Sequence, residues 1–185
     1  MRVNLLAKRY AQALFDLALE MKLEGKVEKD MQLVGAVLQD HREFKKLLKN
    51  PVVDDFKKVK LLNAVFEGHI QELTQKFFAL IVKKDREMYL EPVCEAYIDI
   101  YRKYNNILPL ELTTAYKADK KTKDTIAEKV AKATNMKIEL HETVNKDIIG
   151  GFVINYEDYQ FDASVKTQLK ELQSEFSKNL FIKKL

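Results

Sequence analysis

Three histidines and one cysteine are the side chains of this 185-residue sequence best suited to metal or nucleophilic chemistry. His41, His69 and His141 lie far apart, with no paired spacing and no Cys-x-x-Cys motif near them. Cys94 falls on the apolar face of a predicted helix, which indicates an inert core thiol. A single cysteine also excludes an internal disulfide and suits a reducing compartment. We therefore expect no metal and no cofactor.

The remaining candidate motifs are also explained by structure. Gly150–Gly151 resembles a fragment of a phosphate-binding turn, but it leads into a predicted strand, and no longer glycine motif follows. Asp158 and Asp162 are accounted for as a turn residue and a helix cap. Lysine pairs such as Lys120–Lys121 lack interleaved aromatic residues. The net charge of +4, from 32 basic and 28 acidic residues, is spread along the chain and gives no nucleic-acid signature. The sequence disfavours an enzyme.

The elements that hold these residues change in type near residue 105. Before residue 105, apolar residues recur at helical spacing. The whole chain has only five glycines and three prolines, which favours long helices. The predicted helices cover residues 3–21, 26–39, 41–49, 54–68, 70–84 and 86–104. The sequence thus predicts an N-terminal six-helix bundle over residues 1–105.

After that boundary, residues 107–116 alternate with period two, which is a strand pattern. A charged helix is predicted over 117–135, and a last helix begins near Val165, capped by Asp162 or Ser164. Further strands are predicted over 136–143, 152–156 and 159–161, with a turn at Glu157–Asp158 and a tail from Leu180. Residues 106–185 therefore read as a smaller α/β module with a small sheet, and the whole chain as mainly α.

The first helix is apolar over an arc about 200° wide, roughly twice what one core requires. Its small residues Ala7, Ala11 and Ala18 allow close approach by a neighbouring backbone. Either the helix is wrapped on several sides by its own bundle, or part of its face is left for a partner. No apolar run reaches the length of a membrane span, and the acids that follow Arg9 do not suit a targeting peptide.

Matches to one family run in order along nearly the whole chain. They are Ala7–Phe15 (AKRYAQALF) with Ala18, Asn50–Pro51, Phe78–Leu80 to Arg86 with Leu90, Gly150–Ile154 (GGFVI), Asp158, Asp162, Ser164, Leu169 and Leu172. On these residues the sequence resembles the delta subunit of bacterial F-type ATP synthase, the counterpart of the mitochondrial oligomycin-sensitivity-conferring protein. One departure is Glu157, where the family tends to have glycine.

The resemblance implies a non-catalytic stator subunit that resists rotational torque during proton-driven ATP synthesis. It implies that the bundle binds the N-terminal helix of an alpha subunit between its first and fifth helices. It also implies that residues 106–185 bind the b subunits of the peripheral stalk. The groove residues carried over are Tyr10, Ala13, Leu14, Leu17, Phe77, Phe78, Leu80 and Ile81. Some of these must hold the bundle together, and Tyr10 and Leu80 are the first choices.

The implied location is the cytoplasmic face of the bacterial cell membrane, peripheral and without direct insertion. Two other classes of function stay open from the sequence. An independent adaptor could use the same groove for another helix, and co-purification with ATP synthase subunits would separate the two. A nucleic-acid-binding module would need a basic stripe and a steep loss of binding with salt.

Overall fold

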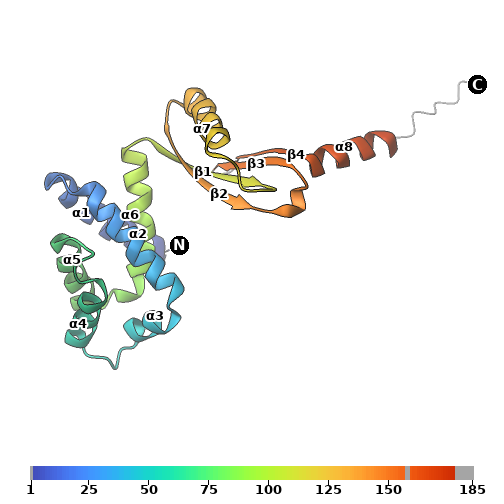
Figure 1. The fold of residues 1–185 in the computed structure, drawn as a ribbon. Helices are drawn as coiled ribbons and strands as arrows, with labels where there is room; N and C mark the ends of the chain where they lie inside the picture. The colour runs from blue at the N-terminus through green and yellow to red at the C-terminus, as the bar shows by residue number, and fades with distance from the viewer. Residues whose placement is uncertain (1, 157–158, 178–185) are drawn as a thin grey trace, which may run out of the picture. The chain divides into compact units, whose positions relative to one another are not determined.

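The computed structural model describes residues 2–156 and 159–177, and the chain divides into two compact units. Unit 1 is Met1–Asn105 and consists of helices, whereas unit 2 is Asn106–Leu185 and is built on a sheet (Figure 1). The predicted fold class, mainly α with a smaller α/β part, is confirmed. The turn predicted at Glu157–Asp158 and the tail from Leu180 lie outside the described residues.

Unit 1 follows the predicted order of helices. They are α1 (Arg2–Glu20), α2 (Glu24–Asp40), α3 (Arg42–Lys49), α4 (Asp55–Phe66), α5 (Glu72–Lys83) and α6 (Leu90–Tyr104), with a 3₁₀ turn, η1 (Glu87–Tyr89), before α6. The proline at position 92 falls in the first turn of α6, where its missing N–H breaks no helical hydrogen bond. Asp54 caps α4 by accepting a hydrogen bond from the backbone N–H of Phe56.

The core of unit 1 forms around α6, which packs most extensively against α1 and α2. Tyr97 of α6 is fully buried, and its ring meets that of Phe15 edge to face at a centroid distance of 5.7 Å. Its hydroxyl donates to the backbone carbonyl of Glu24 at 3.2 Å, so this buried polar atom is satisfied. A second ring pair, Phe66 with Phe78, joins α4 to α5.

The start of α5 is fixed by a residue of α2. No side chain of α5 itself caps the helix, and Gln71 at its N-cap makes no such bond. Instead Asp30, only 3% exposed, accepts from the backbone N–H of Gln71 at 2.8 Å. The same carboxylate oxygen accepts from the Thr74 hydroxyl at 2.6 Å. A buried carboxylate at a helix N-terminus interacts favourably with the unpaired N–H groups there.

A second polar contact ties α4 to η1. Lys58 lies on α4, an amphipathic helix, and is almost fully buried. Its ammonium group forms an ion pair with Glu87. Both charges of such a buried pair lose their hydration, and this cost offsets much of their mutual attraction.

Unit 2 is a four-stranded sheet in the order β2-β1-β3-β4. The strands are β1 (Ile107–Thr114), β2 (Lys137–Val144), β3 (Gly151–Tyr156) and β4 (Tyr159–Ser164). Strands β1 and β2 are parallel and joined by α7 (Lys120–Thr134), whereas β3 and β4 are antiparallel to their neighbours. The helix starts three residues later than predicted because Asp119 caps it, accepting from the Thr122 N–H at 3.2 Å.

Helix α8 (Val165–Ser177) follows β4 without a loop and extends away from the sheet (Figure 1). Its start is held by Asp162, whose Oδ1 accepts from the Ser164 N–H at 2.8 Å and whose Oδ2 accepts from the Thr167 hydroxyl at 2.7 Å. The Ser164 hydroxyl in turn accepts from the Thr167 N–H at 3.2 Å. Both predicted capping residues therefore act, in one network.

These hydrogen bonds make the cap sensitive to acid. Donation from Ser164 and Thr167 to the ionised carboxylate lowers the pKa of Asp162 below its ordinary value of 3.8. Because the pKa of Asp162 is lower in the folded state, the cap contributes its full stability at pH values above the ordinary pKa. This contribution is lost as the pH falls through the lower, folded-state pKa. We expect an NMR titration of the Asp162 carboxyl carbon to give a midpoint below 3.8, with the Thr167 amide shift following it.

Thr167→Val is the matched control, because it removes one donor to the carboxylate and should move the midpoint back toward 3.8. A midpoint at or above that value in the parent protein would show that this network does not form.

Candidate interaction surfaces

The structure divides the eight predicted groove residues into two groups. Four belong to the core of unit 1 and are at most 7% exposed: Leu14, Phe77, Phe78 and Ile81. These four are therefore among the residues that hold the bundle together. They lie on the sides of α1 and α5 that face the other helices, and the bundle covers them. Ala13, Leu17 and Leu80 are exposed, and Tyr10 is half-buried against the core.

The apolar arc of α1 has a covered half and an open half. Ala7, Ala11, Phe15 and Ala18 are buried. The open half is a stripe at helical spacing that runs the length of the helix and that we call the α1 stripe. Its members are Leu6, Tyr10, Ala13, Leu17 and Met21. Part of the apolar face of α1 is therefore not covered by its own bundle.

On α5, one large apolar side chain lies outside the core. Leu80 is 45% exposed and is one turn from the buried Phe77, at the edge of the covered side of the helix. Leu17 is exposed to a similar degree, at 44%, and Met21 at 52%. Met21 was not among the predicted site residues, although its position on the same stripe as Leu17 could have identified it.

The histidines and the cysteine form no catalytic or metal site among the described residues. His41, His69 and His141 are all exposed. The Nε2 atom of His141 lies 3.2 Å from Oε1 of Glu139 on the same strand. Burial raises the pKa of the Cys94 thiol, which keeps it protonated and unreactive. Within residues 2–156 and 159–177 no cluster of three or more histidine, cysteine or acidic side chains could hold a metal ion. In the same ranges, no helix is long and apolar enough to cross a membrane.

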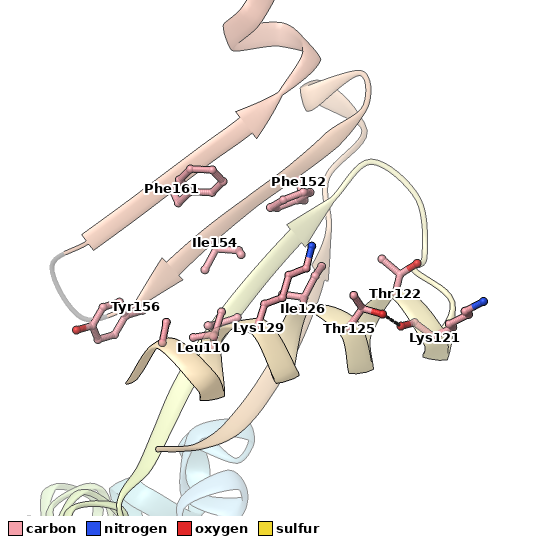
Figure 2. A pocket seen from close by; sticks show the side chains of 12 residues that line it. Leu110, Lys121, Thr122, Thr125, Ile126, Lys129, Phe152, Ile154, Tyr156 and Phe161 are labelled. Carbon is pink, nitrogen blue, oxygen red and sulfur yellow. Dashed lines mark hydrogen bonds between the residues drawn. The ribbon is translucent and has the colours of Figure 1, made fainter. Parts of the chain in front are cut away.

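A second apolar surface, in unit 2, was not predicted. A groove of about 630 Å³ lies between α7 and the sheet (Figure 2). We call it the α7 groove. Apolar side chains of the sheet form one wall: Leu110, Phe152, Ile154, Tyr156 and Phe161. The other wall is α7, with Lys121, Thr122, Thr125, Ile126, Lys129, Val130 and Ala133. The sequence shows alternating apolar residues in β3 and β4. It does not show which part of the sheet α7 leaves uncovered.

The sequence model of the family described as ATP synthase delta (OSCP) subunit matches residues 6–176, almost the whole chain. The chain belongs to this family. The ATP synthase subunit delta of Parabacteroides distasonis is 33% identical, over 97% of this chain and 99% of that protein. The subunit delta of Bacteroides thetaiotaomicron is 30% identical, over 95% of this chain and 96% of that protein.

A solved structure of similar fold comes from the mitochondrial ATP synthase hexamer of Toxoplasma gondii. The TM-score is 0.69 at 24% identity, with 95% of this chain and 99% of that chain covered. The delta/OSCP subunit is a peripheral-stalk component of F-type ATP synthase, structural rather than catalytic. Its partners therefore lie within that complex. The resemblance drawn from the sequence is confirmed, and with it the expectation that the chain is not an enzyme.

Proposed function

We propose that unit 1 binds the N-terminal helix of an alpha subunit through the α1 stripe and Leu80 of α5. Unit 2 binds the b subunits of the peripheral stalk. The chain then links the catalytic head to the stalk at the cytoplasmic face of the bacterial membrane. Held in this way, the head resists the torque of the rotating central stalk while the chain itself performs no chemistry.

The observation that carries the proposal is the open half of α1. A helix that docks in an apolar surface uses anchors at i, i+3, i+4 and i+7, and the α1 stripe presents apolar residues at that spacing. Leu17, Met21 and Leu80 are exposed by 44%, 52% and 45%, so each offers apolar surface to a partner. Membership of a stalk-subunit family makes a partner helix within ATP synthase the natural occupant.

Aspartate at Leu17 or Leu80 should weaken this contact, because docking would bury a carboxylate without a partner. We expect Leu17→Asp and Leu80→Asp each to reduce the affinity for a peptide of the alpha N-terminal segment about tenfold or more. Calorimetric titration of the full chain measures this. Binding of the parent should show a negative heat-capacity change, which marks apolar burial. Leu17 replaces Tyr10 as first choice because Tyr10 also packs on the core.

Val52→Asp is the matched control. Val52 is 88% exposed in the connection between α3 and α4, so the same loss of an apolar side chain occurs outside the α1 stripe and away from α5. Circular dichroism confirms that each variant is folded before titration. If Leu17→Asp and Leu80→Asp are folded and bind like the Val52 variant, the proposed surface is wrong.

A further inference from the structure

The α7 face of the sheet is only half covered. Four strands span roughly 19 Å, which leaves room for two helices packed about 10 Å apart. Only α7 lies on this face among the described residues, and it packs on the β1–β2 side. On the β3–β4 side, Ile154 pairs across the strands with Phe161, so that both side chains point to the same face. Phe161 is 61% exposed there (Figure 2).

The dimensions of the α7 groove match a helix better than a small ligand. Its α7 wall runs from Lys121 to Ala133, which at 1.5 Å per residue is about 18 Å. The sheet wall adds aromatic side chains from two strands, Phe152 and Phe161, whose ring centroids are 6.2 Å apart. A second helix beside α7 would cover these rings and complete the layer.

One hydroxyl group of the α7 wall is satisfied within the helix itself. The Thr125 hydroxyl donates to the Lys121 carbonyl at 2.7 Å, as Figure 2 shows. At the cap, the backbone N–H of Thr122 donates to the Asp119 carboxylate at 3.2 Å. The ammonium groups of Lys121 and Lys129 form no ion pair within the part of the chain that the structure describes, whereas Lys123 is paired with Glu142. The groove is thus mainly apolar, with two lysines whose backbone positions are about 12 Å apart along the axis of α7.

These features point to one occupant. We infer that the α7 groove binds an amphipathic helix of another subunit that carries acidic residues beside its apolar stripe, about two turns apart, facing Lys121 and Lys129. This rests on the proposed function, which gives unit 2 a stalk subunit to bind. A single anionic head group could not reach both lysines, which disfavours a fatty acid or lipid.

Segments of this chain fit the groove less well. The Asp162–Ser164–Thr167 network directs α8 away from the sheet, and no loop separates β4 from α8 to allow a return. In a second copy, the stripe of α8 (Val165, Leu169, Leu172, Phe176) is available, with Leu169 52% exposed and Phe176 85% exposed. However, α8 carries Lys166 and Lys170 as well as Glu171 and Glu175, so it brings no net negative charge to the α7 wall.

The first test uses two designed helical peptides with the same leucine stripe, one with flanking glutamates and one with flanking lysines. Fluorescence anisotropy with the full chain measures binding. We expect the glutamate peptide to bind at least about tenfold more tightly than its twin. Phe161→Glu should reduce its affinity about tenfold or more, and Lys121→Glu with Lys129→Glu should reverse the preference. Equal binding of both peptides, or no binding of either, would overturn the inference.

Gln160→Glu is the matched control for Phe161→Glu, because it adds the same charge on the neighbouring residue of β4, which points to the opposite face. Lys132→Glu is the control on α7, since Lys132 is exposed and does not line the groove. Should Phe161→Glu fail to fold, the lysine variants alone decide the outcome. If the groove variants bind like these controls, the inference is overturned.

A second titration uses the soluble b-subunit segment from the same organism. If the parent binds the glutamate peptide through the groove but not the b segment, the proposed function of unit 2 fails and the groove inference stands. If the b segment binds equally to parent and groove variants, the function stands and the inference fails. Sedimentation that shows self-association abolished by Phe161→Glu would identify a second copy as the occupant instead.

Discussion

Replacing Asp30 with alanine is expected to lower the free energy of unfolding by about 3 kcal/mol, a large effect for a single substitution. The substitution leaves the Gln71 N–H and the Thr74 hydroxyl without their shared acceptor in a site from which water is excluded. It also removes the negative charge from the N-terminus of α5. Urea unfolding followed by circular dichroism measures the change, with hydrogen exchange of the α5 amides as a local readout.

Asp40→Ala is the control for this experiment, because Asp40 is exposed at the end of the same helix and its loss should change stability by less than about 0.5 kcal/mol. Asp30→Asn keeps an acceptor oxygen and should fall between the two. The result matters for function, since α5 carries Leu80 and a frayed start would displace it. Equal stability of the Asp30→Ala and Asp40→Ala proteins would show that the buried carboxylate is not what holds α5.

Gly151→Ala is expected to destabilise unit 2 by about 3 kcal/mol or more. Gly151 begins β3 with φ +75°, in the left-handed region that side chains disfavour. A Cβ there would lie 2.2 Å from the backbone carbonyl oxygen of Ala163 on β4. The neighbouring backbone cannot rotate aside like a side chain, so β3 and β4 must separate at this end. Hydrogen exchange of the β3 and β4 amides reports on unit 2 alone.

Gly68→Ala provides an unusually close control, because Gly68 has the same φ of +75° but nothing within 4 Å of the added Cβ. Its cost should be limited to the conformational term of about 1 to 2 kcal/mol, felt in unit 1. The difference between the two variants isolates the close approach of two backbones. If both substitutions lower the free energy of unfolding by the same amount, the close contact with Ala163 adds no destabilisation and the expected effect is wrong.

The two surfaces differ in how they were found. The apolar arc of α1 is wider than one core requires, so the sequence leaves an open stripe as one of two alternatives. The α7 groove was not anticipated, because strand alternation shows that Phe152 and Phe161 share a face but not which face a helix covers. Packing decides that point: α7 follows β1 and crosses to β2, so it covers that side of the sheet and leaves β3 and β4 open.

The sequence alone determined the order and type of the elements, the position near residue 105 where helices give way to strands, and the family. Periodicity and capping chemistry are local, so a single sequence carries them: Asp162 caps the helix beside it as predicted, although the cap at Asp119 places the start of α7 three residues after the predicted one. Chain-wide matches from residues 7 to 172 made the family evident, since many weak motifs in a fixed order are jointly specific.

Only the tertiary structure decided which apolar residues are buried in the core and which stay exposed. Leu14 and Leu17 look alike on a helical wheel, yet the first is 3% exposed and the second 44%. Lys58 and Asp30 are buried despite their charges, because partners from other helices, Glu87 and Thr74, meet them there. Burial and pairing depend on neighbours brought together by folding, and that information is not contained in the spacing of residues along one helix.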